Sequence, residues 1–368
     1  MRIAVVAGPD PGHAFPAIAL CLQFQAAGDT ATLLTGRQWL DTARAAGVAA
    51  VELAGLDLDV GDDDGDAGAK IHRRAARMAV LNAPVIRALA VDLVCSDVIT
   101  ACGGMAAELL GVPWVEVAPH PLYLPSKGLP PLGSGLAPGV GLRGRARDAV
   151  MRALTARSIR VGERDRAAAR LSIGLPGPDP GPLRRLIATL PALEVPRPDW
   201  PAEAVVVGPL HFEPTDAVLT PPPGSGPLVV VAPSTAATGA AGLAEVALTA
   251  LTPGRGLPAG LRVAVSRLGG ADVLVCGGGH GIVAKSLRHG VPLVTVPGGG
   301  DQWEIANRVV RQGSGRLIRP LTAEALTAAV AGVLADPRYR DAAAVAGAGV
   351  DRVADPVRVC HDALAATR

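Results

Sequence analysis

The sequence predicts an α/β protein of two doubly wound, Rossmann-like parallel-sheet domains that face each other across a cleft. Short apolar runs rich in β-branched residues alternate with longer helical stretches over residues 1–120. A Pro- and Gly-rich linker comes later in the chain, and the same alternation restarts beyond it. Strands that are apolar on both faces are typical of a parallel sheet covered by helices. The 368 residues suffice for two such domains, each with its own core.

The N-terminal half begins with a strand and continues in strand–helix order. Its predicted strands are residues 3–7, 30–35, 48–53, 92–96, 114–118 and 204–207, and its predicted helices are residues 14–27, 38–46, 70–90 and 101–110. Pro84 is expected to kink or break the helix over 70–90, because proline removes an intrahelical hydrogen bond and clashes with the preceding turn.

Three segments of this half depart from that pattern. Residues 119–141, rich in Pro, Gly and Leu, are predicted to form a long apolar loop, and loops of that length are usually functional or disordered. Residues 143–170 form an arginine-dotted helical stretch, for which a solvated helix face is favoured over a polyanion or membrane-surface site. The Pro- and Gly-rich residues 175–182 exclude a helix or a central strand.

The C-terminal half repeats the alternation. Its predicted strands are residues 228–232, 261–265, 272–276 and 292–296, and its predicted helices are residues 240–251, 281–287, 303–310, 323–334 and 356–366. The boundaries that follow are an N-terminal domain over 1–212, a linker over 213–227, a C-terminal domain over 228–352 and a last helix over 353–368. Ligands of such a protein are expected in the cleft, at the carboxyl ends of the strands.

Composition excludes several classes of partner and location. No stretch approaches the roughly 18 to 20 uncharged apolar residues that span a bilayer, and residues 1–7 lack the longer apolar region of a signal peptide. A net charge of +2 and 2% aromatic residues argue against nucleic acid as a partner. Five widely spaced cysteines without a CxxC pair disfavour disulfides and structural zinc. We therefore expect a cytoplasmic protein without an integral membrane segment, with peripheral membrane contact left open.

The first candidate site follows the first strand, at Gly8–His13. A histidine at the carboxyl end of a strand, facing the cleft, is well placed to act as a general base. The alternative is that His13 only caps or packs the helix. A histidine base usually needs an orienting carboxylate. Asp97 follows the strand over 92–96, so its loop should lie at the same edge of the sheet as His13. Asp97 could equally be a helix N-cap.

Two Gly-rich turns form the second and third candidate sites. Residues 276–281, Cys-Gly-Gly-Gly-His-Gly, lie between a strand and a helix, where free backbone N–H groups can hold a diphosphate. They match neither a P-loop nor a GxGxxG fingerprint, and a simple tight turn is the alternative. Asp301 and Gln302 follow the second turn, Pro-Gly-Gly-Gly over residues 297–300. An acid and an amide side by side can bind several sugar hydroxyls, and the alternative is that Asp301 only caps the next helix.

The order His13, Asp97, Gly-rich turn and Asp301-Gln302 resembles the UDP-glycosyltransferase-like enzymes, and among them the bacterial antibiotic and macrolide glycosyltransferases. Residues 193–198 and 207–210 are similar to the interdomain stretch of that group. The resemblance covers nearly the whole chain. It implies the GT-B fold, with an acceptor-binding N-terminal domain, a nucleotide-sugar-binding C-terminal domain and a last helix that packs back on the first domain.

The resemblance also implies roles for individual residues. His13 would deprotonate the acceptor hydroxyl and Asp97 would steady its imidazolium, so that the sugar is transferred with inversion. Other roles, which the resemblance gives to groups of residues, are diphosphate binding by Gly278, Gly279, His280, Gly281 and Ile282, donor-sugar binding by Asp301 and Gln302, and acceptor binding by Pro119, His120, Leu122 and Tyr123. The donor, a UDP- or dTDP-hexose, is a co-substrate, and no cofactor or metal is implied. The acceptor is expected to be small and apolar: a polyketide, a lipid or a phenolic compound.

The sequence departs from the family pattern at the donor turn. Gly277 replaces the phosphate-binding histidine, Ile282 the hydroxyl residue and Lys285 the ribose-binding glutamate. A hydrogen bond to a charged group contributes about 1.5–3 kcal/mol, so such losses weaken donor binding or change the donor. His280 and Lys285 are candidate replacements as phosphate ligands.

The segment over residues 262–272 is also shorter than the corresponding segment of the family, which contains a further strand, a helix and a loop that stacks on the nucleotide base. The alternatives left open are a non-catalytic nucleotide-sugar-binding or helper protein with a degenerate donor site, and a nucleotide-sugar epimerase. The acidic run Asp62–Asp64, superficially a metal-binding DxD motif, is best explained as a solvated loop.

Overall fold

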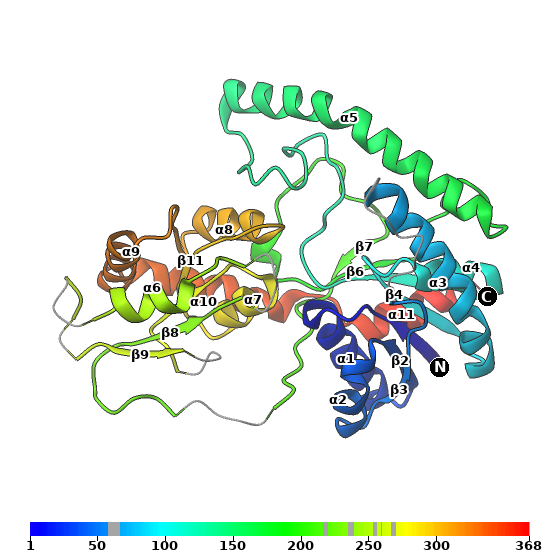
Figure 1. Ribbon diagram of the computed structural model, residues 1–368, viewed down its shortest axis with the longest axis horizontal. Helices are drawn as coiled ribbons and strands as arrows, with labels where there is room; N and C mark the ends of the chain where they lie inside the picture. The colour runs from blue at the N-terminus through cyan, green and yellow to red at the C-terminus, as the bar shows by residue number, and fades with distance from the viewer. Residues whose placement is uncertain are drawn as a thin grey trace.

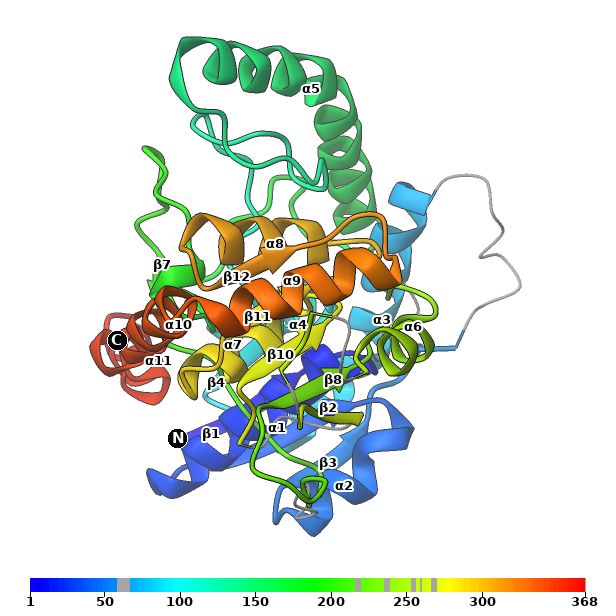
Figure 2. The same ribbon diagram turned by 90° about the vertical axis from the view of Figure 1, so that its left-hand side faces the viewer.

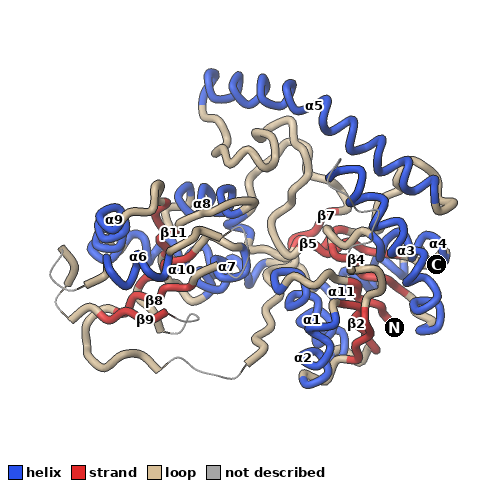
Figure 3. The backbone as a smooth tube through the Cα atoms, viewed as in Figure 1, coloured by secondary structure: helices blue, strands red, loops and turns tan. Residues whose placement is uncertain are grey.

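The computed structural model consists of two parallel-sheet α/β domains, seen side by side in Figure 1. The described residues are 1–57, 67–215, 220–234, 239–252, 256–258, 260–265 and 270–367. The predicted fold class is confirmed. Figure 3 shows the strands of each domain gathered in one sheet, with helices around it.

Over the described residues, the N-terminal sheet has the strand order β3-β2-β1-β4-β5-β6-β7, and all its pairs are parallel. The strands are β1 (Arg2–Val6), β2 (Thr30–Thr35), β3 (Ala49–Glu52), β4 (Leu93–Asp97), β5 (Trp114–Ala118), β6 (Arg185–Ile187) and β7 (Ala204–Val206). The helices of this domain are α1 (Pro11–Ala26), α2 (Leu40–Ala45), α3 (Ala67–Leu89), α4 (Cys102–Leu110) and α5 (Gly141–Ser172).

The central strand β1 explains why this sheet is covered on both faces. Ile3 and Val5 join the apolar core that includes α1, whereas Ala4 and Val6 join the core that includes α3 and α4. Successive side chains of a strand point to opposite faces, so an uninterrupted apolar strand needs a helical layer on each side. The β-branched run at the start of the sequence therefore fixes a central, doubly covered strand.

The C-terminal sheet is also parallel, with the order β12-β11-β10-β8-β9. Its strands are β8 (Leu228–Ala232), β9 (Arg262–Val265), β10 (Val273–Cys276), β11 (Leu293–Thr295) and β12 (Gly315–Leu317). The helices of this half are α6 (Leu243–Ala250), α7 (His280–Arg288), α8 (Gln302–Arg311), α9 (Ala323–Ala335), α10 (Arg338–Ala348) and α11 (Pro356–Ala365).

Four elements differ from the sequence predictions. Helix α3 runs continuously through Pro84, because its contacts with α4 and α5 outweigh the hydrogen bond that proline removes. Strands β6 and β12 and helix α10 were not predicted. A three-residue strand is too short to show a period of two, and α10 is an Arg- and Ala-rich segment without a clear apolar stripe.

The last helix, α11, lies on the N-terminal domain. Val357 and Cys360 are buried in the same core as β1 and α1, and Figure 1 places the C-terminus beside that domain. His361 Nε2 lies 2.7 Å from Asp29 Oδ2. Burial alone would raise the pKa of Asp29, but its bonds to the N-terminal ammonium and to His361 hold that pKa below its usual range. The chain therefore crosses back from the second domain to the first.

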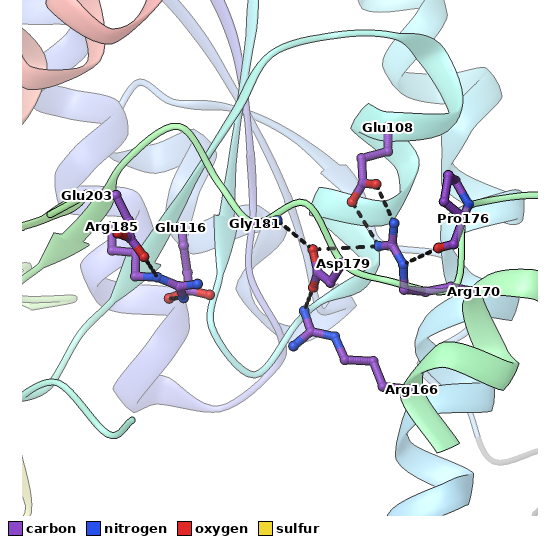
Figure 4. Close-up of polar contacts among 9 residues, drawn as sticks. All are labelled: Glu108, Glu116, Arg166, Arg170, Pro176, Asp179, Gly181, Arg185 and Glu203. Atoms are coloured by element: carbon purple, nitrogen blue, oxygen red, sulfur yellow. Dashed lines mark hydrogen bonds and ion pairs between the residues drawn. The ribbon is translucent and has the colours of Figure 1, made fainter. Parts of the chain in front are cut away.

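Helix α5 extends beyond the body of the molecule in Figures 1 and 2. The outer part exposes apolar residues such as Leu142 and Leu154, while the C-terminal part packs against α3. There Arg170, only 1% exposed, donates to both carboxylate oxygens of Glu108 at 3.0 and 2.6 Å and to the Pro176 carbonyl at 2.9 Å (Figure 4). Asp179 pairs with Arg166 beside it. This network fixes the base of α5.

Two further observations concern the composition-based expectations. All five cysteines are buried as free thiols. None of the helices in the described ranges is long and apolar enough to cross a membrane.

Candidate active site

His13 and Asp97 meet at the carboxyl edge of the N-terminal sheet. Asp97 ends β4, which pairs with β1 in the register Val6–Ser96, and His13 lies in the first turn of α1 directly after β1. Pro11 occupies the start of α1, where its fixed backbone suits a helix and its missing N–H costs nothing. His13 Nδ1 lies 2.6 Å from Asp97 Oδ2. The adjacency expected from two parallel strand ends is thus present.

The carboxylate of Asp97 is fixed by a full set of donors. Its Oδ1 accepts hydrogen bonds from the Ile99 amide at 3.0 Å and from the Thr100 amide and hydroxyl, each at 3.2 Å. Oδ2 is then directed at His13. A carboxylate held in this way keeps the proton of the imidazole on Nδ1, which leaves the Nε2 lone pair to accept a proton from a ligand.

The protonation equilibrium of His13 is shifted by its surroundings. Burial disfavours the imidazolium, but the hydrogen bond and negative charge of Asp97, with the charges of Asp10 and Asp301, raise the pKa of His13 above its ordinary value. Asp301 belongs to the C-terminal domain, so both domains contribute to the electrostatics of this imidazole. The His13 side chain keeps 17% of its surface exposed, which leaves it accessible to a ligand.

Aromatic rings extend from His13 toward the C-terminal domain. The ring centroids of His13 and His120 are 6.1 Å apart, and His120 stacks on Tyr123 at 4.5 Å. The guanidinium of Arg308, on α8, lies 5.4 Å from the Tyr123 ring. The Tyr123 hydroxyl is buried without a hydrogen-bond partner among the described residues. Burial and the negative charge of Asp301 raise the pKa of Tyr123 above its usual range.

His120 is held as a neutral ring. Its Nδ1 donates to the Pro121 carbonyl at 2.7 Å, so Nε2 carries the lone pair. Burial lowers the pKa of His120, and the nearby His13 adds to that effect despite the hydrogen bond to Pro121. His120 and Tyr123 therefore form one wall beside the candidate base.

The other two residues predicted to bind the acceptor are placed differently. Leu122 is 2% exposed and packs in a core cluster with Ile187 and Ala204, because the loop doubles back over the sheet edge. The Leu122 side chain thus packs in the core, and its predicted contact with an acceptor stays a prediction. Pro119 is buried at the end of β5.

The loop over 119–140 is anchored to the C-terminal domain and to the interdomain stretch. The Gly133 amide donates to Glu304 at 2.8 Å, and Asn307 donates to the Gly135 carbonyl at 2.9 Å. Glu194 and Arg197 bind the backbone of residues 122–124. Sequence reasoning did not assign roles to these residues. The available signal was the similarity of residues 193–198 to an interdomain stretch, which covers Glu194 and Arg197 but not Glu304 and Asn307.

A cavity of about 30 Å³ lies between this loop and α8. It is lined by apolar residues of the loop and polar residues of the helix, including Leu129, Leu136, Arg308 and Arg311. That volume holds about one water molecule. An acceptor that enters here therefore has to displace the loop.

The Gly-rich turn after β10 leaves backbone amides open. Gly278 has a φ of 85°, and a Cβ there would lie 3.1 Å from the Gln302 carbonyl oxygen. Gly279 and Gly281 face open space, since a Cβ at either position would meet nothing within 4 Å. The turn leads into the N-terminus of α7, where unpaired amides and the helix dipole favour an anion. Ile282, in the same turn, is half-buried against the C-terminal core.

The imidazole of His280 does not point into this open space. The side chain is buried, and its Nε2 lies 2.8 Å from the hydroxyl of Thr189 in the N-terminal domain. Only the backbone amide of His280 is left for a ligand at the helix N-terminus. The imidazole contacts the N-terminal domain and not the open space at the turn, because the turn lies against the ends of β5 and β6.

Asp301 and Gln302 take different positions at the start of α8. Asp301 makes no side-chain capping bond to its own helix, and its charge acts on His13, His120 and Tyr123. Gln302 is 3% exposed, accepts from the Gly298 amide at 3.0 Å and donates to Ser234 at 3.3 Å. The charge of Asp301 therefore acts on residues of the N-terminal domain, whereas the Gln302 amide holds the turn together.

Gly277 and Lys285, which depart from the family pattern, both lie close to other side chains of the protein. A Cβ at Gly277 would lie 3.3 Å from the Ser234 Cβ and 3.4 Å from Gln302 Oε1, so these side chains crowd the space that a larger residue would need. Lys285 Nζ lies 2.5 Å from Glu213 Oε1, in the segment after the N-terminal domain. Lys285 thus pairs with a carboxylate of the protein.

Two sequence features lie partly or wholly outside the described residues. Strand β9 pairs with β8, but residues 266–269 of the short segment that follows are not described. The acidic run Asp62–Asp64 also falls outside the described residues. In the part of the chain that is described, no cluster of three or more His, Cys, Asp or Glu side chains could hold a metal ion.

Comparisons with known proteins give a consistent picture. Residues 244–362 match the family described as "Erythromycin biosynthesis protein CIII-like, C-terminal domain". The chain is 29% identical to 4'-demethylrebeccamycin synthase of Lentzea aerocolonigenes, over 92% of this chain and 93% of that one. Its structure is similar to a spinosyn forosaminyltransferase, with a TM-score of 0.74, 18% identity and 99% of each chain covered. A spinosyn rhamnosyltransferase complexed with thymidine diphosphate gives a TM-score of 0.67 at 19% identity, over 98% and 99% of the two chains.

Proposed function

We propose that the chain, whose fold is that of the GT-B glycosyltransferases, is an antibiotic-type glycosyltransferase that moves a hexose from a nucleoside-diphosphate sugar to a hydroxyl of a small, apolar acceptor. The observation that carries this proposal is the His13–Asp97 pair, whose free Nε2 lies within the electrostatic reach of Asp301 on the opposite domain. A base on one domain and a sugar-binding carboxylate on the other suit a reaction between two substrates held in the cleft.

The proposed reaction is a single displacement with inversion. His13 Nε2 takes the proton of the acceptor hydroxyl as the oxygen attacks the anomeric carbon. The bond from that carbon to the diphosphate breaks, and its electron pair leaves with the diphosphate. Asp97 stabilises the imidazolium that forms. The new bond forms on the face opposite the leaving group, so the anomeric configuration inverts.

The leaving diphosphate is proposed to rest on the amides at the start of α7. Gly279 and Gly281 leave room for it, and the helix N-terminus supplies partial positive charge. These groups stabilise the departing charge without a metal ion or a cofactor. Asp301 is proposed to receive hydroxyls of the donor sugar, and His120 and Tyr123 to contact the acceptor.

The donor is proposed to be a dTDP- or UDP-sugar. Support for dTDP comes from the thymidine diphosphate in the structurally similar rhamnosyltransferase. The Lys285–Glu213 pair, together with Gly277 and Ile282, supports a second candidate function: a nucleotide-sugar-binding or helper protein without catalysis.

A transfer assay distinguishes the two functions. The protein is incubated with UDP- and dTDP-hexoses and a panel of apolar polyketide, lipid and phenolic acceptors. We expect a mass gain of one hexose on an acceptor, an inverted anomeric centre by NMR and the same rate with a chelator present. Binding of sugar nucleotides by calorimetry, without transfer or donor hydrolysis, would instead establish the non-catalytic function.

The pH profile of Asp97→Asn provides a test of the base. Only unprotonated His13 accepts a proton, so kcat/KM of the wild type should rise with pH through the raised pKa of His13, above 6.5. Loss of the Asp97 carboxylate lowers that pKa, so the acid limb should move to lower pH. The maximal rate should fall about 10- to 100-fold, because the imidazole loses its orienting partner.

Asp10→Asn is the matched control, because the Asp10 carboxylate acts on the His13 imidazole through its charge, and its backbone bond to the His13 amide is unchanged in the variant. Its acid limb should move less, and its maximal rate should stay close to that of the wild type. An acid limb that stays in place in Asp97→Asn would contradict the assignment of His13 as the titrating base.

A further inference from the structure

We propose that His280 is a positioning residue that fastens the Gly-rich turn of the C-terminal domain to the N-terminal domain and thereby sets the donor diphosphate opposite His13. The inference rests on the proposed glycosyl transfer. It assigns the His280 side chain to the interface between the domains instead of to the phosphates.

The contacts of His280 lead to two neighbouring strand ends of the other domain. Its Nε2 lies 2.8 Å from the hydroxyl of Thr189, two residues after β6, and the backbone of Pro119, directly after β5, acts on the pKa of the ring. Strands β5 and β6 are adjacent and parallel, with Ala118 opposite Ile187. Their carboxyl ends lie on the sheet edge that also carries His13 and Asp97. The imidazole therefore reaches the edge on which the candidate base lies.

The surroundings of His280 fix the charge of its ring. Burial, with the nearby His120, His211 and Arg308, lowers the pKa of His280 to about 3, so the ring stays neutral with one donor and one acceptor. The hydroxyl of Thr189 can donate to Nε2 or accept from it, so it suits either neutral form of the ring. The bond therefore joins two neutral groups of the two domains.

This fastening connects the two halves of the candidate site directly. On the C-terminal side, His280 is the first residue of α7, next to the open amides of Gly279 and Gly281. On the N-terminal side, Pro119 is bonded in the chain to His120, whose ring centroid lies 6.1 Å from that of His13. A misplacement of about 1 Å can cost a reaction about 100-fold, so this contact can control the rate without touching a substrate.

Other contacts keep the domains joined when His280 is changed. Leu190 and Leu193, which follow Thr189, are buried in the C-terminal core beside Val283 and Leu287. Arg308 also donates to the Leu193 carbonyl at 3.0 Å. Removal of the His280 contact should therefore loosen the turn against the strand ends and increase the average separation of the two domains, while both stay folded and joined through these other contacts.

Thr189→Val and His280→Ala test the proposal from its two sides. Valine keeps the size of threonine and removes only the hydroxyl, so Thr189→Val leaves the imidazole and the turn in place. We expect kcat to fall about 10- to 100-fold in either variant, with the Kd of dTDP, or of the preferred nucleotide, changed less than about twofold. The double variant should be no slower than His280→Ala, because the two changes remove the same contact between Thr189 and His280.

The matched control is Thr327→Val, which removes a threonine hydroxyl bonded to the Ala250 carbonyl inside the C-terminal domain. Its kcat should match the wild type. His280→Gln, whose amide keeps one donor group and one acceptor, should recover part of the rate lost in His280→Ala. A purely structural role would lower the midpoint of unfolding in all of these variants without this pattern in kcat.

Small-angle scattering of the ligand-free proteins adds a readout that does not depend on transfer. The radius of gyration of His280→Ala should exceed that of the wild type, even if the wild type transfers no sugar. An inactive wild type would thus overturn the proposed function alone. Unchanged kcat and radius in both single variants, or a loss confined to nucleotide affinity, would overturn the positioning role.

Discussion

His13→Ala is expected to lower kcat about 10²–10⁴-fold while the affinity for the sugar nucleotide stays nearly unchanged. The variant removes the imidazole that Asp97 holds through Nδ1, and with it the Nε2 lone pair that is proposed to accept the proton. The proposed donor contacts lie on the other domain, at Gly279, Gly281 and Asp301, and alanine at position 13 leaves them intact. Initial rates at saturating donor and acceptor, with calorimetry of the nucleotide, separate the two effects.

A matched control exists on the same domain. His361 also bonds to a carboxylate, that of Asp29, but lies on α11 away from the cleft. His361→Ala should retain the wild-type kcat. Full transfer activity in His13→Ala would end the assignment of this imidazole as the base, and an equal loss in His361→Ala would show that the effect reflects folding.

Arg170→Ala is expected to lower the free energy of unfolding by about 3–5 kcal/mol. Arg170 is 1% exposed and is bound to both oxygens of Glu108, so its removal leaves a carboxylate in a largely buried position without its counter-charge. It also removes the bond to the Pro176 carbonyl, which holds the segment after α5. Denaturant titration followed by circular dichroism measures the loss. Hydrogen exchange should show increased opening of α5.

Two comparison variants make this result interpretable. Arg358 and Asp362 form an exposed pair on α11, and Arg358→Ala should cost no more than about 1 kcal/mol because water screens such pairs. The double change Arg170→Met with Glu108→Gln should recover part of the loss, since no uncompensated charge remains. A cost below about 1 kcal/mol for Arg170→Ala would mean that α5 is held mainly by its apolar contacts with α3.

The sequence was informative where a local pattern determines the structure. The apolar runs of β1, β4 and β10 are buried on both faces, and the glycines after β10 form the predicted turn. The proximity of His13 and Asp97 was also predictable, because both follow parallel strands whose carboxyl ends meet at one edge. A regular period and a fixed strand direction were sufficient for these inferences.

Features that depend on contacts between distant segments were not predictable in this way. The direction of the His280 ring depends on how α7 meets Thr189, which lies 91 residues earlier in the chain. The resemblance assigns Leu122 to acceptor binding, and it gave no sign that the folding of its loop buries this side chain. Strand β6 is three residues long and forms only because β5 and β7 lie on either side of it.

The chain path makes each half of the molecule incomplete without the other. Leu190 and Leu193 complete the core of the second domain although they precede β7 of the first, and α11 completes the core of the first although it ends the chain. A protein divided at the Pro-rich linker would separate both pieces from the cores they fill. The halves are therefore interdependent folding units, and expression of either one alone would expose apolar surface that the intact chain buries.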